Sequence, residues 1–134
     1  MGKRSFEIEM KVRDYELDAQ GIVNNANYLH YFEFTRHEFL ESKNISFSES
    51  HNEGVDPVVS RVDINYKSSL KGSDRFISTV KVERSGIKLI FNQEIYRKSD
   101  MRLCCKAMTE VVILINGKLS MGDYYDKVLE DYLQ

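Results

Sequence analysis

Several protein classes are excluded by what this sequence lacks. It holds one proline and seven glycines, and 42% of its 134 residues are hydrophobic, so it is neither a collagen-like nor an intrinsically disordered chain. No stretch approaches the roughly 20 apolar residues of a transmembrane helix, and the N-terminus lacks the apolar segment of a signal peptide. We therefore expect one globular domain spanning residues 1–134, with no membrane span.

The cysteines, the charges and the serines exclude further classes. Cys104 and Cys105 are adjacent, so an ordinary disulfide between them is sterically disfavoured, the spaced ligand pairs of a metal site are missing, and a reducing, cytoplasmic setting suits them. The 19 basic and 21 acidic residues give a net charge of -2, and the basic ones are scattered, so no nucleic-acid partner is expected. Neither Ser60 nor Ser68 has the GxSxG context of a serine hydrolase.

Alternating and β-branched segments predict an antiparallel sheet. Residues 5–13 alternate apolar and charged side chains with the period of two that is typical of a half-buried strand. Four later segments are rich in Val, Ile, Phe and Tyr and are bounded by turn residues: 58–70, 75–84, 87–98 and 103–115. The joints between these segments are short, and short joints favour antiparallel neighbours over crossover helices.

One long helix is predicted ahead of the four later strands. Between Asn27 and Ser42 the apolar residues recur at helical spacing and form a broad stripe. The polar stretch that follows predicts a loop ending near Pro57, and the tail 120–134 predicts a short helix capped by Asp123. A sheet of this kind cannot bury a face alone, so the long helix should pack across it. The expected fold class is α+β, with a curled antiparallel five-stranded sheet around one helix.

The segment DAQGIVNNANY, from Asp18 to Tyr28, carries the candidate chemistry. Backbone N–H groups at a helix start have no intrahelical partners and lie at the positive end of the helix dipole, so they can hold negative charge that develops on a substrate oxygen. Gly21 permits a tight turn and close approach of a ligand, and Asp18 supplies a nucleophile or a general base. The alternative from spacing alone is that Asp18 forms a turn and that Asn25 or Asn27 caps the helix.

This segment resembles the signature of the hotdog-fold acyl thioesterases, in particular the 4-hydroxybenzoyl-CoA thioesterase-like group. The signature is an aspartate, two variable residues, a glycine, a valine and then N-Y-x-x-Y/W before the central helix. The matching positions are Asp18, Gly21, Val23, Asn27, Tyr28 and Tyr31. The likeness continues through residues 58–74, FNQEIYRK and the NGK turn, so it spans nearly the whole chain.

The resemblance implies a hotdog fold and hydrolysis of the thioester of acyl-CoA or acyl carrier protein, without metal or redox cofactor. Asp18 matches the catalytic aspartate, acting as nucleophile or as base for water, and the Asn25 backbone N–H would polarise the thioester carbonyl. The residues expected to contact the substrate are Gly21, Val23, Asn27 and Tyr28. Many relatives carry histidine at the position of Asn25, and some carry proline at Ser69. Because the acyl group enters between subunits in relatives, a homodimer or homotetramer is expected.

Two other functions stay open at this point. A hotdog dehydratase or hydratase would act on the same thioesters by proton abstraction, but it would need a histidine in the substrate loop. A non-catalytic acyl-thioester binding module would keep the pocket and tolerate the loss of Asp18.

Several other side chains could have a functional role, but each also has a purely structural explanation. Glu33 and His37 lie one helical turn apart, either as an acid–base pair or as an exposed surface pair. Cys105 is expected to be a buried thiol rather than a nucleophile. The phosphates of coenzyme A could be bound by Arg84, Lys88 and Arg97. The simpler alternative is that these three residues lie on the solvent-exposed face of the sheet. His51 is expected to be solvent-exposed rather than a metal ligand.

Overall fold

An antiparallel sheet forms the body of the molecule. The computed structural model describes residues 4–133. The strands are β1 (Phe6–Lys11), β2 (Val55–Tyr66), β3 (Arg75–Ser85), β4 (Lys88–Arg97), β5 (Arg102–Ile115) and β6 (Lys118–Leu119). Their order is β1-β3-β4-β5-β2, every pair is antiparallel, and β6 pairs with β5. The predicted sheet of five long strands is confirmed, and β6 adds a strand two residues long.

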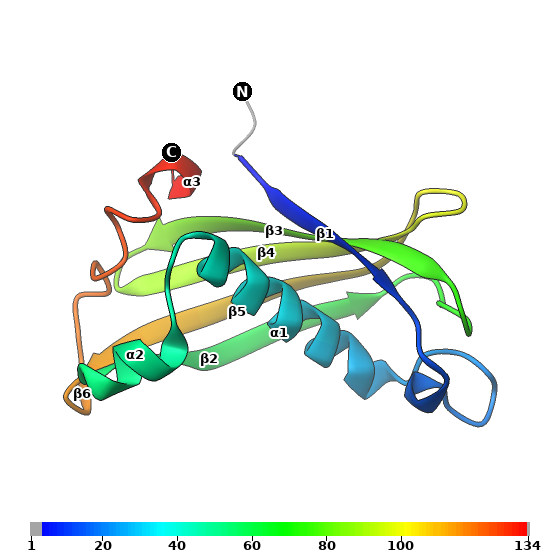
Figure 1. Cartoon of the computed structure of the whole chain (residues 1–134), viewed down its shortest axis with the longest axis horizontal. Coiled ribbons are helices and arrows are strands. Elements are labelled where there is room, and N and C mark those ends of the chain that lie inside the picture. Colours follow the sequence, from blue (N-terminus) through cyan, green and yellow to red (C-terminus); the bar gives the residue numbers. More distant parts are fainter. Residues whose placement is uncertain (1–3, 134) are drawn as a thin grey trace.

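The long helix α1 (Asn25–Ser42) lies across one face of the sheet (Figure 1). Its buried side chains are Tyr28, Tyr31, Phe32, Thr35, Phe39 and Leu40. These side chains recur at helical spacing, and all but Thr35 pack into two hydrophobic clusters, one containing Phe39 and Val80 and the other containing Tyr31 and Phe76. The α+β class and the central helix are therefore confirmed.

The start of α1 lies two residues before its predicted start at Asn27. Asn24 is the N-cap, and its side-chain oxygen accepts a hydrogen bond from the backbone N–H of Ala26 at 2.9 Å. Asn27 instead donates from its side chain to the carbonyl oxygen of Glu16, also at 2.9 Å. The prediction that Asn25 or Asn27 caps the helix is therefore wrong, although the capping residue is the neighbouring asparagine.

The segment predicted as a loop after α1 contains a second helix, α2 (Phe47–Asn52), which is capped by the side chain of Ser46. β2 then begins at Val55, so Pro57 lies inside a strand rather than at the end of a loop. A proline is tolerated there because β2 is at the edge of the sheet, and in the described part of the chain no strand on its outer side needs an N–H donor.

The predicted C-terminal helix is shorter than expected. Residues 124–129 form turns, and only the four residues of α3 (Glu130–Leu133) are helical. Tyr125, Leu129 and Tyr132 are buried against the cluster that contains Phe39. The tail is thus held by side-chain packing rather than by helix formation. A further short element, the 3-10 turn η1 (Asp14–Glu16), follows β1.

Edge strand β2 leaves apolar side chains exposed beside α1. A bulge at Ser60 shifts its register against β5, so that Val59 pairs with Val111 and Arg61 pairs with Glu110. The β2 side chains on the α1 side of the sheet are therefore Pro57, Val59, Val62, Ile64 and Tyr66. Val59, Val62 and Tyr66 are 48%, 39% and 47% exposed, although their partners on β5 are buried. We call the strip formed by these three residues and by Leu29 of α1, itself exposed, the seam.

A second bulge buries both cysteines. Ile95 of β4 pairs with Cys105, and Tyr96 pairs with Leu103, which leaves Cys104 as the extra residue of β5. Side chains of adjacent strand residues normally point to opposite faces, but here both thiols are fully buried in the cluster that contains Tyr31. Both are free, and burial raises the pKa of Cys105 to about 12.

Among residues 4–133, neither α1 nor any shorter helix combines the length and the apolar character that crossing a membrane requires.

Candidate active site

Asp18 lies in a tight loop between η1 and α1. Its backbone N–H donates to the carbonyl oxygen of Ile22 at 2.8 Å, and its own carbonyl oxygen accepts from Gly21 at 3.1 Å. One carboxylate oxygen, Oδ1, accepts from the backbone N–H of Gln20 at 2.8 Å. Gly21 closes the turn in the left-handed region, with a φ of 77°. Asp18 therefore does form a turn, and its second oxygen makes no hydrogen bond within residues 4–133.

The Asp18 loop opens onto a cavity of about 270 Å³. Four of the predicted site residues line this cavity: Asp18, Val23, Asn25 and Tyr28. Gly21 and Asn27 do not line it; Gly21 shapes the turn, and Asn27 ties α1 to the chain before the loop. Another part of the lining is Tyr66 to Ser69, the last residue of β2 and the three residues after it, which the sequence did not single out as a wall of the site.

The first residue of α1, Asn25, lines this cavity and has a backbone N–H that is free within residues 4–133. The cap of Asn24 occupies the N–H of Ala26, whereas the N–H of Asn25 is the first of the helix and has no hydrogen-bond partner in the described part of the chain. The helix dipole adds partial positive charge there. Tyr66 donates its hydroxyl to the Asn25 carbonyl oxygen at 3.2 Å and so ties the helix start to the end of β2. The arrangement suits a carbonyl oxygen that gains negative charge.

Tyr28 forms an apolar wall of the cavity. Its hydroxyl accepts a hydrogen bond from the backbone N–H of Leu70 at 3.3 Å, and its ring meets that of Tyr66 edge to face with centroids 5.6 Å apart. Burial raises the pKa of Tyr28 to about 12, so the phenol is neutral at physiological pH. Tyr28 therefore shapes the cavity rather than supplying a base.

The residue Glu16, whose carboxylate is buried, holds the Asp18 loop in place. Glu16 is 4% exposed, and it accepts hydrogen bonds from the backbone N–H of Arg13 (2.7 Å), the Arg13 guanidinium (2.8 Å) and the Tyr31 hydroxyl (2.8 Å). Its carbonyl oxygen accepts from the backbone of Asn24 and the side chain of Asn27. Burial alone would raise the pKa of Glu16, but the hydrogen bonds from Arg13 and Tyr31 outweigh burial and lower it.

Replacing Glu16 with glutamine should lower the free energy of unfolding at pH 7 by about 1–3 kcal/mol, because charge-assisted hydrogen bonds to a buried group are lost. The folded-state pKa of Glu16 lies below the ordinary value of 4.5, so its contribution is complete above that pH and is lost as the pH falls through the folded-state pKa. Denaturant unfolding at neutral and acidic pH checks this. The difference between the two proteins should shrink in acid, whereas exposed Glu7→Gln should change little at either pH.

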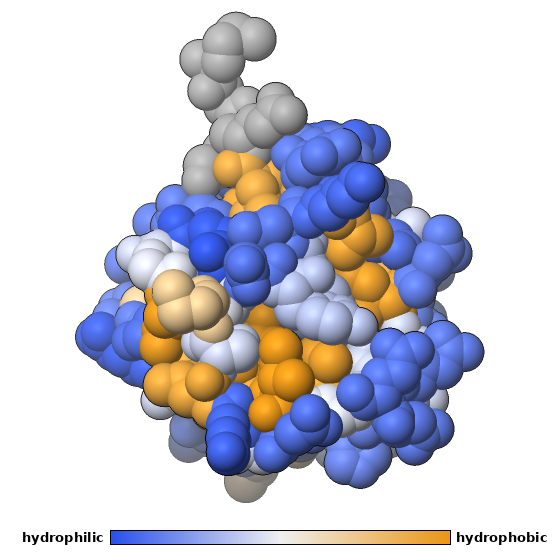
Figure 2. All heavy atoms as spheres, turned by 90° about the vertical axis from the view of Figure 1, so that its left-hand side faces the viewer, coloured by the Kyte–Doolittle hydropathy of each residue, from blue (hydrophilic) through white to orange (hydrophobic). Residues whose placement is uncertain are grey.

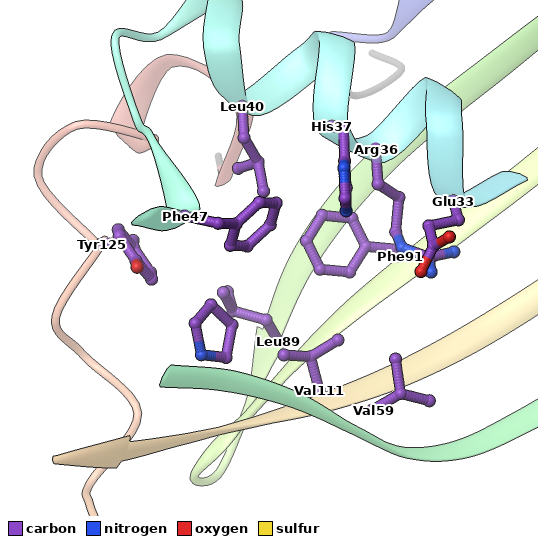
Figure 3. A pocket seen from close by; sticks show the side chains of 11 residues that line it. Glu33, Arg36, His37, Leu40, Phe47, Val59, Leu89, Phe91, Val111 and Tyr125 are labelled. Atoms are coloured by element: carbon purple, nitrogen blue, oxygen red, sulfur yellow. The ribbon is translucent and has the colours of Figure 1, made fainter. Parts of the chain in front are cut away.

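A second cavity, of about 290 Å³, lies further along α1. It is mainly apolar, with Leu40, Phe47, Leu89, Phe91 and Val111 among its lining residues, and Glu33, Arg36 and His37 project from α1 into its wall (Figure 3). At this end of the molecule, apolar side chains gather in the middle of a face with a hydrophilic rim (Figure 2). The His37 ring packs against Phe47, with centroids 4.5 Å apart. Glu33 and His37 thus lie away from Asp18.

The other candidate side chains have structural partners. Arg84 lies 3.2 Å from a carboxylate oxygen of Asp126, and Lys88 pairs with Glu110. Arg97 pairs with Asp100 and donates to the carbonyl oxygen of Ser69, at the rim of the Asp18 cavity. His51 is exposed and pairs with Asp56 at 2.6 Å. Among residues 4–133, no three His, Cys, Asp or Glu side chains are placed to share a metal ion.

Comparison with known proteins places this geometry in a family. The model of the Thioesterase-like superfamily matches residues 12–122, which include the Asp18 loop, α1 and all the strands after it. The chain belongs to the Thioesterase-like superfamily. The predicted family resemblance and the hotdog fold are therefore confirmed.

Individual thioesterases are similar to this chain over different shares of their length. Acyl-acyl carrier protein thioesterase ATL3 of Arabidopsis thaliana is 38% identical over 92 residues, which are 68% of this chain and 48% of that protein. Long-chain acyl-CoA thioesterase FadM of Escherichia coli is 30% identical and covers 81% of this chain and 82% of its own. This chain spans about half the length of ATL3.

The crystal structure of an Aquifex aeolicus protein has the same fold. It superposes with a TM-score of 0.83 at 32% identity, covering 95% of this chain and 98% of its own. The likeness therefore extends over nearly all of this chain.

Proposed function

We propose that this chain hydrolyses the thioester of acyl-CoA or of acyl carrier protein. The observation that carries the proposal is that one cavity is lined by both Asp18 and Asn25, and that the Asn25 N–H, the first of α1, has no hydrogen-bond partner among residues 4–133. An acid that can attack and an N–H that can hold an oxyanion are the two groups that acyl transfer from a thioester requires. ATL3 and FadM are named for these two kinds of substrate, which supports the proposal.

The proposed chemistry starts with the thioester carbonyl oxygen accepting a hydrogen bond from the Asn25 N–H. Asp18 either attacks the carbonyl carbon with its unoccupied oxygen or takes a proton from a water that attacks. The carbon–sulfur bond then breaks, and the thiolate leaves and is protonated. In the nucleophilic route, water hydrolyses the resulting anhydride. Both routes yield a carboxylate and a free thiol, and both need Asp18 ionised.

The seam offers an apolar path for the acyl chain. On α1, the side chains of Asn25, Leu29 and Glu33 are four residues apart and therefore lie on one face, running from the Asp18 cavity to the second cavity. On β2, Tyr66 lines the Asp18 cavity and Val59 lines the second one, with exposed Val62 between them. An alkyl chain lying along this strip would remove those side chains from water.

A second copy of the chain would supply the missing outer wall of the seam. β2 is an edge strand of 12 residues, and among residues 4–133 no strand pairs with its outer side; long apolar edges tend to pair with another chain. Two-fold pairing of β2 with its own copy would join the sheets and place the two seams against each other. The proposed active unit is therefore at least a homodimer, and a tetramer would be a dimer of dimers.

Thiol release from a panel of acyl-CoA and acyl-carrier-protein substrates tests the proposed activity directly. Hydrolysis of at least one member of the panel supports it. A hydratase would change the acyl chain without releasing thiol, and a binding module would bind the thioesters and leave them intact. Either of these results would refute the proposal.

Dilution should lower the specific activity as the oligomer dissociates, because each seam would lose its outer wall. Sedimentation measurements and thiol-release rates on the same dilution series check this. The two curves should fall together with concentration. A monomer that retains full activity would contradict the shared site while leaving the chemistry at Asp18 intact.

A further inference from the structure

Arg36 is a cation at the wall of an otherwise apolar cavity. Its side chain is half-buried and lines the second cavity together with Glu33, Phe91 and Val59. Within residues 4–133, Arg36 forms no ion pair with a carboxylate. Burial lowers the pKa of Arg36, although the nearby charge of Glu33 partly opposes this. A half-buried guanidinium loses part of its hydration, and without an ion pair this costs free energy unless other groups accept its hydrogen bonds.

The Arg36 head group is held in position by a neutral partner. Its Nη1 donates to the side-chain oxygen of Gln93 at 3.0 Å, and the Gln93 nitrogen donates to the carbonyl oxygen of Phe32 at 3.0 Å. Gln93 is fully buried, so both of its polar ends are satisfied inside the core. One guanidinium nitrogen is thus anchored, and the remaining donors keep a defined direction.

Glu33 provides an acceptor beside this donor. The head groups of Glu33 and Arg36 point toward each other at one end of the cavity (Figure 3). A hydroxyl group can accept a hydrogen bond from a guanidinium and donate one to a carboxylate at the same time. A carboxylate ligand would be attracted by Arg36 but repelled by Glu33, and a methyl group could bond to neither.

The position of Arg36 places this polar pair at the far end of the seam. Asn25 and Arg36 are 11 residues apart on α1, which corresponds to about 16 Å along the helix axis. A thioester carbonyl held at the Asn25 N–H would therefore have its chain end, not the atoms next to the thioester, near Arg36.

We propose that Arg36 and Glu33 select acyl chains that carry a hydroxyl group at the end remote from the thioester. This inference rests on the proposed function for the placement of the thioester, but it concerns recognition rather than the chemistry at Asp18. The hydroxyl would accept from Arg36 and donate to Glu33, whereas an unsubstituted chain would offer no acceptor to the Arg36 donors that Gln93 does not occupy.

Binding of coenzyme A thioethers tests the inference without any need for hydrolysis. The ligands are decyl, dodecyl and tetradecyl thioethers, each with a methyl, a hydroxyl or a carboxyl terminus, and their dissociation constants are measured by titration calorimetry on the intact protein. At the best-fitting length we expect the hydroxyl ligand to bind about tenfold or more tightly than the methyl ligand, because hydrogen bonds to charged groups are involved. The carboxyl ligand should bind less tightly than the hydroxyl ligand.

Two variants assign the preference to the polar pair. Arg36→Met keeps the length and apolar contacts of the side chain and should remove the preference for the hydroxyl ligand. Glu33→Gln changes an exposed residue and should raise the affinity for the carboxyl ligand relative to the hydroxyl ligand. Arg75→Met is the matched control, because Arg75 pairs with Glu9 and lines neither cavity, and it should leave the preference unchanged.

Several results would overturn the inference. These are equal affinity for hydroxyl and methyl ligands at all three lengths, tighter binding of the carboxyl ligand, a preference that survives in Arg36→Met, or no measurable binding. If Arg36→Met dissociates the oligomer and wild-type protein shows no hydroxyl preference, Arg36 serves subunit contact instead. A hydroxyl preference in a protein that releases no thiol would refute the proposed hydrolysis while leaving the recognition by Arg36 intact.

Discussion

Asp18→Asn should reduce the turnover number on the best thioester by about a hundredfold or more, which corresponds to roughly 3 kcal/mol of barrier. The amide has the size of the carboxylate and keeps an oxygen that can accept the N–H of Gln20, so the turn should persist. It lacks the negative charge that either route requires, whether the group attacks carbon or removes a proton from water. Substrate binding should be retained.

The Asp18 experiment separates catalysis from turn formation by two observables. Thiol release at saturating substrate reports turnover, and thermal unfolding reports stability. Asp74→Asn is a matched control, because Asp74 also accepts a backbone N–H in a turn, from Lys71 at 2.8 Å, but does not line the Asp18 cavity. The control should change stability without a large change in turnover. An Asp18→Asn protein with wild-type turnover would remove Asp18 from the reaction.

Gly21→Val should lower both stability and turnover, and the loss of turnover should be the larger effect. At a φ of 77°, a β-branched residue is strained by about 1–3 kcal/mol. A Cβ at Gly21 would meet no atom within 4 Å, so strain rather than crowding is the cause. Gly21 donates its N–H to the Asp18 carbonyl oxygen, and relief of strain would therefore move Asp18. Displacement of a reacting group by about 1 Å can lower the rate by tenfold to a hundredfold.

The turn between β3 and β4 supplies a matched control for Gly21. Gly86 has a φ of 61°, and a Cβ there would likewise meet no atom within 4 Å. Gly86→Val should therefore lose stability to a similar extent while keeping its turnover number. Turnover is measured at a temperature where both variants are folded. Equal losses of turnover in the two variants would mean that Gly21 matters to the site only through global stability.

Elements with a strong local pattern were predictable from the sequence. The alternation before Arg13 and the apolar stripe after Asn27 each determine which side of a strand or helix is buried, and both elements were found. α2 was not predicted because six mainly polar residues, FSESHN, have no apolar periodicity. The bulges at Ser60 and Cys104 were not predicted because the pairing of β5 with its neighbours sets them, and a single strand does not display that pairing.

Only those residues of the candidate site that are close together in the sequence were predictable. Asp18, Val23, Asn25 and Tyr28 lie within 11 consecutive positions, so a local motif could bring them together as candidates. The wall formed by Tyr66 to Ser69 depends on the return of β2 to the start of α1, about 40 positions later, and no local signal marks it. The contact between Arg36 and Gln93 spans 57 positions and likewise depends on the folded sheet.

Burial of the two cysteines at the β5 bulge makes the protein suitable for an assay that detects released thiol. Reagents that detect a released thiol react with thiolates, and Cys104 and Cys105 are fully buried, with burial raising the pKa of each. The folded protein should therefore contribute little background when coenzyme A is released. Once the chain unfolds, both sulfurs become accessible, so the same reagent without substrate would count unfolded molecules. One dye could thus follow turnover and loss of structure in every variant described above.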